Sequence, residues 1–168
     1  EWFNPSGSVK DRAALFILRQ ALDSGELSPG KRLLDSTSGN MGIAYATLCA
    51  SLDIPVTLAL PSNASAERIA ILRTLGAELI LTDPLEGSDG ATQVAKEMAQ
   101  RNPELYFYAN QYDNPASWWA HYHTTGPEIA LQTGYAITHF VAGLGTTGTL
   151  TGTSRYLKEH NPQVMVVA

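Results

Sequence analysis

The chain has 168 residues, of which 44% are hydrophobic, and a net charge of −5 at neutral pH. This length suits one ordinary domain or slightly more, and the apolar share is enough for a core. The Lys and Arg residues form no cluster and no run approaches the roughly 18 apolar residues of a membrane span, so we expect neither nucleic-acid nor membrane binding.

Strand-like and helical patterns alternate along the chain. The β-rich runs predict strands at 32–35, 55–60, 78–82, 105–108, 138–142 and 163–167. Helical patterns cover 13–22, 40–52, 64–75, 87–100, 117–132 and 149–160. Strands that alternate with helices of this length predict an α/β fold, with open parallel sheets covered by helices on both faces.

A turn-rich stretch at 110–115 indicates a domain boundary. We therefore expect a smaller N-terminal α/β domain at 1–112 and the incomplete start of a larger domain at 113–168. The first residue is not Met and the last five residues resemble a buried strand. These two ends favour a fragment of a longer protein.

Lys10 follows the loop Asn-Pro-Ser-Gly-Ser-Val and precedes a helical pattern. A helix N-terminus disfavours a cation and so lowers the pKa of an amine. A lysine of this kind suits Schiff-base chemistry with an aldehyde. Asp11 places a negative charge beside the amine and opposes the shift, so the sequence alone leaves the net effect open.

The turn that follows the strand at 32–35 reads Asp-Ser-Thr-Ser-Gly-Asn-Met-Gly. It offers hydroxyls, an amide and backbone N–H groups at a helix start, a combination that suits a carboxylate. Simple N-capping of the helix is the alternative, but one cap requires only one such residue.

A second turn, Gly-Leu-Gly-Thr-Thr-Gly-Thr at 143–149, follows the strand at 138–142. Its glycines and hydroxyls at a helix start suit a phosphate. The turn also matches G-x-G-x-x-G, yet no acidic residue stands where a dinucleotide site expects one. A monophosphate is therefore favoured. The amine, the carboxylate turn and the phosphate turn together match the needs of pyridoxal 5′-phosphate.

Other reactive side chains have simpler interpretations. His121 and His123 lack the spacing of a helical metal pair, so we expect packing or surface roles and no metal site. Cys49 lies in an apolar helical run, which predicts a buried, inert thiol. A single cysteine also fits a reducing cytoplasm.

Residues 4–12, 37–42 and 145–149 resemble the three signature segments of the cysteine synthase family, which comprises fold-type II pyridoxal-phosphate enzymes. Similarity at 64–81, 120–129 and 138–156 extends this resemblance over nearly the whole chain. The Gly-Thr-Thr-Gly-Thr loop with the Ser-Arg-Tyr helix is similar to the B-type O-acetylserine sulfhydrylases in particular.

The resemblance implies a role for each motif residue. Lys10 would form the Schiff base with the cofactor and then act as acid and base at the substrate α-carbon. Asn40 would bind the ring hydroxyl of the cofactor. The substrate would contact Thr37, Ser38, Gly39, Asn40, Met41 and Gln111. The cofactor phosphate would contact Gly145, Thr146, Thr147, Gly148 and Thr149. Met41 replaces a Thr that is usual in the family and cannot donate a side-chain hydrogen bond.

The implied activity is β-elimination of acetate from O-acetylserine, followed by addition of sulfide or thiosulfate to give cysteine or S-sulfocysteine. The family also implies a homodimer, and its residue at the ring nitrogen comes from a later segment. We therefore expect no activity from these 168 residues alone. Four alternatives stay open: a cystathionine β-synthase or serine/threonine dehydratase, a phosphoserine-using sulfhydrylase, a nicotinamide dehydrogenase, and a non-catalytic binding or assembly piece.

Overall fold

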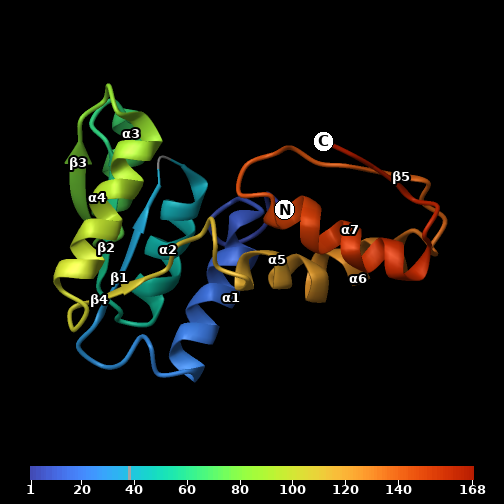
Figure 1. Ribbon diagram of the computed structural model, residues 1–168, viewed down its shortest axis with the longest axis horizontal. Coiled ribbons are helices and arrows are strands. Elements are labelled where there is room, and N and C mark those ends of the chain that lie inside the picture. The colour runs from blue at the N-terminus through green and yellow to red at the C-terminus, as the bar shows by residue number, and fades with distance from the viewer. Residues whose placement is uncertain (38) are drawn as a thin grey trace. The chain divides into compact units, whose positions relative to one another are not determined.

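The computed structural model describes residues 1–37 and 39–168 (Figure 1). These residues form two compact units, Glu1–Asn110 and Gln111–Ala168. Among them, no helix has both the length and the apolar character needed to cross a membrane.

A four-stranded parallel sheet forms the centre of the first unit, with the strand order β3-β2-β1-β4. Its strands are β1 (Arg32–Ser36), β2 (Val56–Pro61), β3 (Glu78–Thr82) and β4 (Tyr106–Tyr108). Its helices are α1 (Lys10–Asp23), α2 (Asn40–Ser51), α3 (Ala66–Thr74) and α4 (Gly87–Arg101). Every residue of β2 is buried, as expected for a largely apolar strand that is covered on both faces.

The order of the strands determines which helices share a face. The chain moves in one direction from β1 through α2, β2 and α3 to β3, and then α4 carries it back to β4. Right-handed crossovers therefore place α2 and α3 on one face and α4 on the other. On the α4 face, Ala91 and Ala95 belong to one buried cluster with Leu34 and Ala59. The predicted α/β architecture is confirmed.

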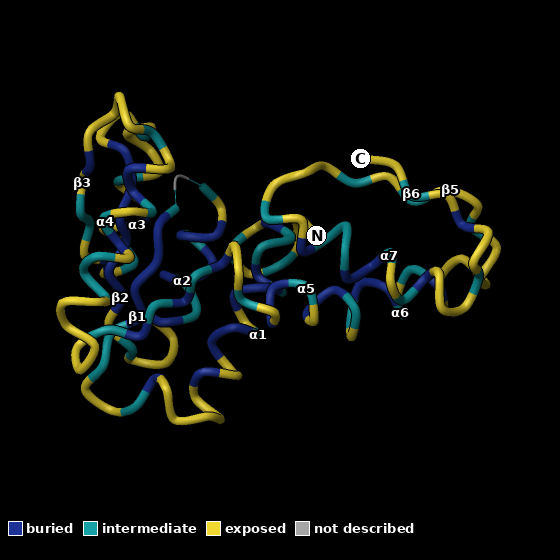
Figure 2. Tube along the Cα trace, viewed as in Figure 1, coloured by how far each residue is buried: buried dark blue, intermediate teal, exposed yellow. Residues whose placement is uncertain are grey.

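The second unit is built around a long helical run and one further helix. The run consists of α5 (Ala116–Ala120), the π-helix η1 (His121–Thr125) and α6 (Gly126–Gln132). It packs along α7 (Gly148–His160), as Figure 1 shows. The short strands β5 (His139–Val141) and β6 (Met165–Val167) pair in parallel. Both are largely exposed, whereas β1 and β2 are buried (Figure 2).

Candidate active site

The loop before Lys10 is fixed by its own side chains. Asn4 donates from its side-chain amide to the Ser8 carbonyl oxygen at 3.0 Å. The Asp11 carboxylate accepts from the Ser6 backbone N–H at 2.8 Å and also pairs with the Ser6 hydroxyl. The Lys10 backbone N–H contacts the Ser8 hydroxyl at 3.3 Å. The first residue of α1 is therefore presented by a loop that is held at several points.

Burial of the Lys10 amine lowers the pKa of this lysine. The sequence left the direction open because Asp11 could have opposed the shift. In the structure, the Asp11 carboxylate is engaged by Ser6 in the preceding loop. A larger share of Lys10 is thus unprotonated near neutral pH than for an exposed lysine, as attack on an aldehyde requires.

Thr37 organises the turn between β1 and α2. Its backbone N–H donates to the Ala59 carbonyl at 2.9 Å. Its hydroxyl oxygen accepts from the N–H groups of Gly39 and Gly42, both at 3.2 Å. A Cβ atom at Gly42 would lie 2.5 Å from the Thr37 methyl carbon, so only glycine leaves the Thr37 side chain in this position. Because the hydroxyl accepts both bonds, it retains its own proton to donate to an anion.

The remaining residues of this turn differ in exposure. Gly39 is half-buried, and Asn40, the first residue of α2, is exposed. Met41 is buried, with 3% of its surface exposed. Its thioether therefore belongs to the interior, and its backbone N–H in the first helical turn is the group suited to an anion. Ser38 lies outside the described residues.

Gln111 comes shortly after β4, the strand beside β1. Leu34 pairs with Tyr108, and the Ala109 backbone N–H donates to the Leu34 carbonyl at 2.9 Å. Strands β2 and β3 lie on the other side of β1, so the direction of the chain across the sheet reverses between β1 and β4. Open parallel sheets bind ligands at such a switch point, beyond the carboxyl ends of the strands.

The phosphate turn ends at the start of α7. Thr147 adopts the left-handed conformation (φ 63°) and Gly148 begins the helix. Among the described residues, no side chain caps this N-terminus, and its first turn contains no acidic residue. The first N–H groups of α7 therefore suit an anion. A Cβ atom at Gly148 would lie 2.7 Å from the Ser117 hydroxyl, so the helix can begin here only with glycine.

His121 is a residue whose connection to the phosphate turn the sequence did not indicate. The residue is buried, with 2% of its surface exposed. Its Nε2 lies 3.2 Å from the Thr149 hydroxyl, and its Nδ1 lies 2.9 Å from the Thr125 hydroxyl. The spacing of His121 and Thr125 is compatible with a helical pair, but Thr149 is 28 positions away. His123, by contrast, is exposed.

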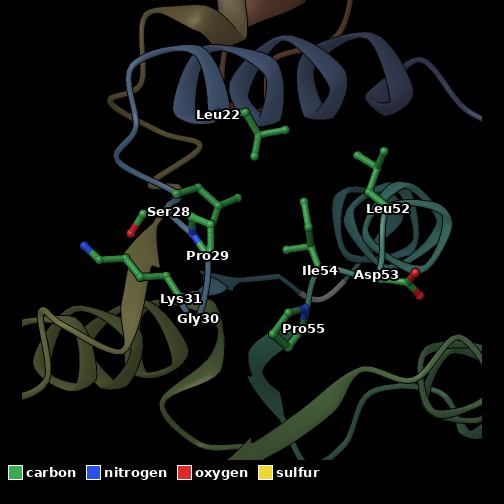
Figure 3. A pocket seen from close by; sticks show the side chains of 10 residues that line it. Leu22, Ser28, Pro29, Gly30, Lys31, Leu52, Asp53, Ile54 and Pro55 are labelled. Atoms are coloured by element: carbon green, nitrogen blue, oxygen red, sulfur yellow. The ribbon is translucent and has the colours of Figure 1, made fainter.

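A cavity of about 430 Å³ lies at the other end of the sheet (Figure 3). Leu22 of α1, Lys31 before β1 and Pro55 before β2 contribute to its lining. It therefore borders the amino ends of β1 and β2, while Thr37 follows the carboxyl end of β1. Its lining contains none of the predicted site residues.

These features define a class of protein. A half-buried amine of lowered pKa, a carboxylate-sized anion turn and an uncapped helix N-terminus with flanking hydroxyls fit an enzyme that uses an aldehyde cofactor with a phosphate group. The residues present fit pyridoxal phosphate, which has both groups.

The comparisons agree with this class. Residues 1–168 match the family of pyridoxal-phosphate dependent enzymes, and the chain belongs to it. It is 54% identical to the cysteine synthase of Aquifex aeolicus over 167 residues, which are 99% of this chain and 51% of the relative. Identity to the cysteine synthase B of Escherichia coli is 49% over 164 residues, 98% of this chain and 54% of the relative.

A solved structure shows the same fold. The crystal structure of the cysteine synthase of Entamoeba histolytica matches with a TM-score of 0.93 and 40% identity, over 99% of this chain and 49% of the other. The chain thus spans about half the length of the relatives it matches. These matches confirm the predicted family, the predicted similarity to its B-type members and the predicted cofactor.

Proposed function

We propose that this chain supplies the lysine, the carboxylate turn and the phosphate turn of a cysteine synthase that acts on O-acetylserine. Acetate leaves the β-carbon, and sulfide adds to give cysteine; thiosulfate would give S-sulfocysteine. The observation that carries the proposal is the half-buried Lys10 with its lowered pKa, in a chain whose relatives are named cysteine synthases. The lone buried Cys49 suits a reducing cytoplasm, and the proposed assembly is a homodimer.

Lys10 is the group that bonds the cofactor aldehyde and later moves a proton. Pyridoxal phosphate, when bound, supplies an electron sink for the charge that develops at the substrate α-carbon. With cofactor and substrate bound, Lys10 would remove the proton from the substrate α-carbon and return it once sulfur has added. Burial supports both roles, because it lowers the pKa of the Lys10 amine toward the pH at which the enzyme works.

The two anion turns orient the reactants. Thr37, whose oxygen accepts from the Gly39 and Gly42 N–H groups, donates its remaining hydroxyl proton to the substrate carboxylate, together with other N–H groups of the first turn of α2. Asn40 binds the ring hydroxyl of the cofactor, and the Gln111 amide assists with the carboxylate. In this proposal, Ser38 and the Met41 backbone also contact the carboxylate. The phosphate is held by Gly145, Thr146, Thr147, Gly148 and Thr149.

The role of Lys10 is tested by replacing it in the complete protein. Lys10→Ala should abolish the visible absorbance of the lysine–cofactor Schiff base, its trapping by borohydride, and acetate release from O-acetylserine. Lys96→Ala is the matched control, because Lys96 is an exposed lysine of α4. If Lys10→Ala retained the absorbance and the trapped adduct, the proposed function would be wrong.

The amino-acid donor is tested separately, because Met41 stands where the family usually has a hydroxyl. The complete protein is offered O-acetylserine with sulfide, serine with homocysteine, and phosphoserine with sulfide. We expect turnover with O-acetylserine to be the fastest. Faster reaction with serine and homocysteine would favour a cystathionine β-synthase, and faster reaction with phosphoserine would favour a phosphoserine-using sulfhydrylase.

A further inference from the structure

We propose that His121 is a positioning residue of the phosphate turn, and that it orients the Thr149 hydroxyl so that this hydroxyl donates to the phosphate group. The inference rests on the proposed cofactor site. It assigns a role to a buried histidine that lies outside the three signature segments of the sequence.

The geometry places His121 between two hydroxyls. The Thr149 hydroxyl lies 3.2 Å from Nε2, and the Thr125 hydroxyl lies 2.9 Å from Nδ1. Thr125 is 8% exposed and His121 is 2% exposed, so both belong to the interior of the second unit. Thr149 is in the first turn of α7, where the helix presents its N–H groups. A buried imidazole thus connects the interior to a residue of the phosphate turn.

The direction of the hydrogen bonds follows from the chemistry of the ligand. A phosphate dianion only accepts, so the Thr149 hydroxyl must give its proton to it. The Thr149 oxygen then accepts from His121 Nε2–H, and the bare Nδ1 accepts from the Thr125 hydroxyl. The opposite order would direct the Thr149 proton to Nε2 and leave oxygen lone pairs facing the phosphate. A bound phosphate therefore requires a proton on His121 Nε2.

Close contact between the two helices makes this arrangement possible. A Cβ atom at Gly152 would lie 2.8 Å from the His121 Cβ and 2.1 Å from the Trp118 carbonyl oxygen. Gly148 and Gly152, one turn apart, therefore bring α7 against α5 and η1. The π-helix itself is a rare conformation that occurs frequently at functional sites. Its residues His121 and Thr125 contact each other at a spacing of four.

A role in packing alone makes a different prediction from a role in phosphate positioning. Loss of packing would weaken binding of any cofactor form, because the whole unit would loosen. Loss of positioning would weaken only the form that carries the phosphate. Pyridoxal has the same ring and aldehyde as pyridoxal phosphate but lacks that group, so the ratio of the two affinities separates the two roles.

The experiment compares His121→Phe and His121→Gln in the complete protein. Dissociation constants for pyridoxal phosphate and for pyridoxal are measured by equilibrium dialysis and Schiff-base absorbance. We expect His121→Phe to weaken pyridoxal phosphate binding by about tenfold or more, in line with one hydrogen bond that supports a charged ligand. Pyridoxal binding should not change. His121→Gln, whose amide N–H can replace Nε2–H, should restore part of the loss.

Matched controls come from the same π-helix. His123→Phe changes an exposed histidine and should leave both dissociation constants unaltered. Thr125→Val removes the hydroxyl that pairs with Nδ1 and should weaken pyridoxal phosphate binding selectively. Thr124→Val removes a hydroxyl that bonds the Ala120 carbonyl oxygen and should not. This second pair keeps the test decisive if His121→Phe does not fold.

The outcomes separate the inference from the proposed function. If the unmodified protein binds pyridoxal phosphate through Lys10, and the His121 and Thr125 variants bind both forms as it does, the inference is overturned and the function stands. Equal weakening of both forms also overturns it, because that is the packing result. If the unmodified protein forms no Schiff base with pyridoxal phosphate, the proposed function and the inference both fail.

Discussion

The glycine at position 152 offers a direct test of how α7 packs. A Cβ atom there would lie 2.1 Å from the Trp118 carbonyl oxygen, 2.8 Å from the His121 Cβ and 2.9 Å from the Tyr122 nitrogen. Ordinary carbon–oxygen contacts are about 3.3 Å or longer, so α7 and its neighbour must separate by about 1 Å. Two of the three atoms belong to the backbone, and no side-chain rotation relieves the overlap.

Gly152→Ala should therefore destabilise the second unit despite the better helix propensity of alanine. That propensity favours the variant by about 1 kcal/mol. Overpacking against atoms that cannot rotate away costs about 3 kcal/mol. Loss of the bond between Thr149 and His121, which the separation of the helices would break, adds about 1 kcal/mol. We expect the free energy of unfolding to fall by about 2–3 kcal/mol.

The assay is urea unfolding of the complete protein, followed by the fluorescence of Trp118 and Trp119. Gly143→Ala is the matched control, because no atom lies within 4 Å of its added Cβ and its φ is not positive. The control should change the free energy of unfolding by no more than about 1 kcal/mol. A Gly152→Ala variant as stable as the parent would show that the close contact between α7 and η1 is wrong.

Three further predictions concern the first unit. Burial raises the pKa of Cys49 to about 12, so its thiol should resist an aromatic disulfide reagent at pH 8 until urea unfolds the protein, and rapid native reaction would contradict this burial. The Ser65 side chain accepts from the Arg68 backbone N–H at the start of α3, so Ser65→Ala should lower the free energy of unfolding by about 1 kcal/mol in the same urea assay. Gly42→Ala should raise the KM for the amino-acid substrate, because the added methyl must rotate Thr37 away from its two N–H donors; an unchanged KM would argue against Thr37 as a carboxylate ligand.

The secondary structure was predictable because local patterns and tertiary packing agree in this chain. The run Pro-Val-Thr-Leu-Ala-Leu at 55–60 is apolar enough to predict a strand, and β2, at Val56–Pro61, is buried along its whole length. Gly76 directly follows the predicted helix at 64–75, where glycine commonly ends a helix, and it adopts a positive φ of 83° just after α3. The start of α1 was harder to predict from the sequence. The predicted helix began at residue 13, whereas α1 begins at Lys10. Its first three residues are charged, so they add nothing to an apolar periodicity.

The candidate site was predictable in part, because two of its segments follow strands directly. Polar turns after β1 and after β5 identify themselves by composition, and each precedes a helix start as expected. The surroundings of Lys10 could not be predicted in the same way. Whether the amine is buried, and whether Asp11 neighbours it or turns to Ser6, depends on how the loop folds back, which no local pattern specifies.

The link between His121 and Thr149 could not be derived from the chain at all. The two residues are 28 positions apart, and their contact depends on the close approach of α7 at Gly152. A π-helix also has no periodic sequence pattern that would distinguish it from the α-helix predicted for 117–132. The sequence predicted a packing or surface role for His121 and so left its burial open, and it did not indicate which hydroxyls the ring contacts.

One physical feature serves all three segments of the candidate site: each coincides with the beginning of a helix. Lys10 begins α1, Asn40 begins α2 and Gly148 begins α7. The partial positive charge at a helix N-terminus stabilises an anion, which suits the carboxylate at α2 and the phosphate at α7. The same charge disfavours an ammonium, which suits a lysine that must lose its proton before it reacts. Burial acts on Lys10 in the same direction, so the electrostatic requirements of the amine and of the two anions do not conflict.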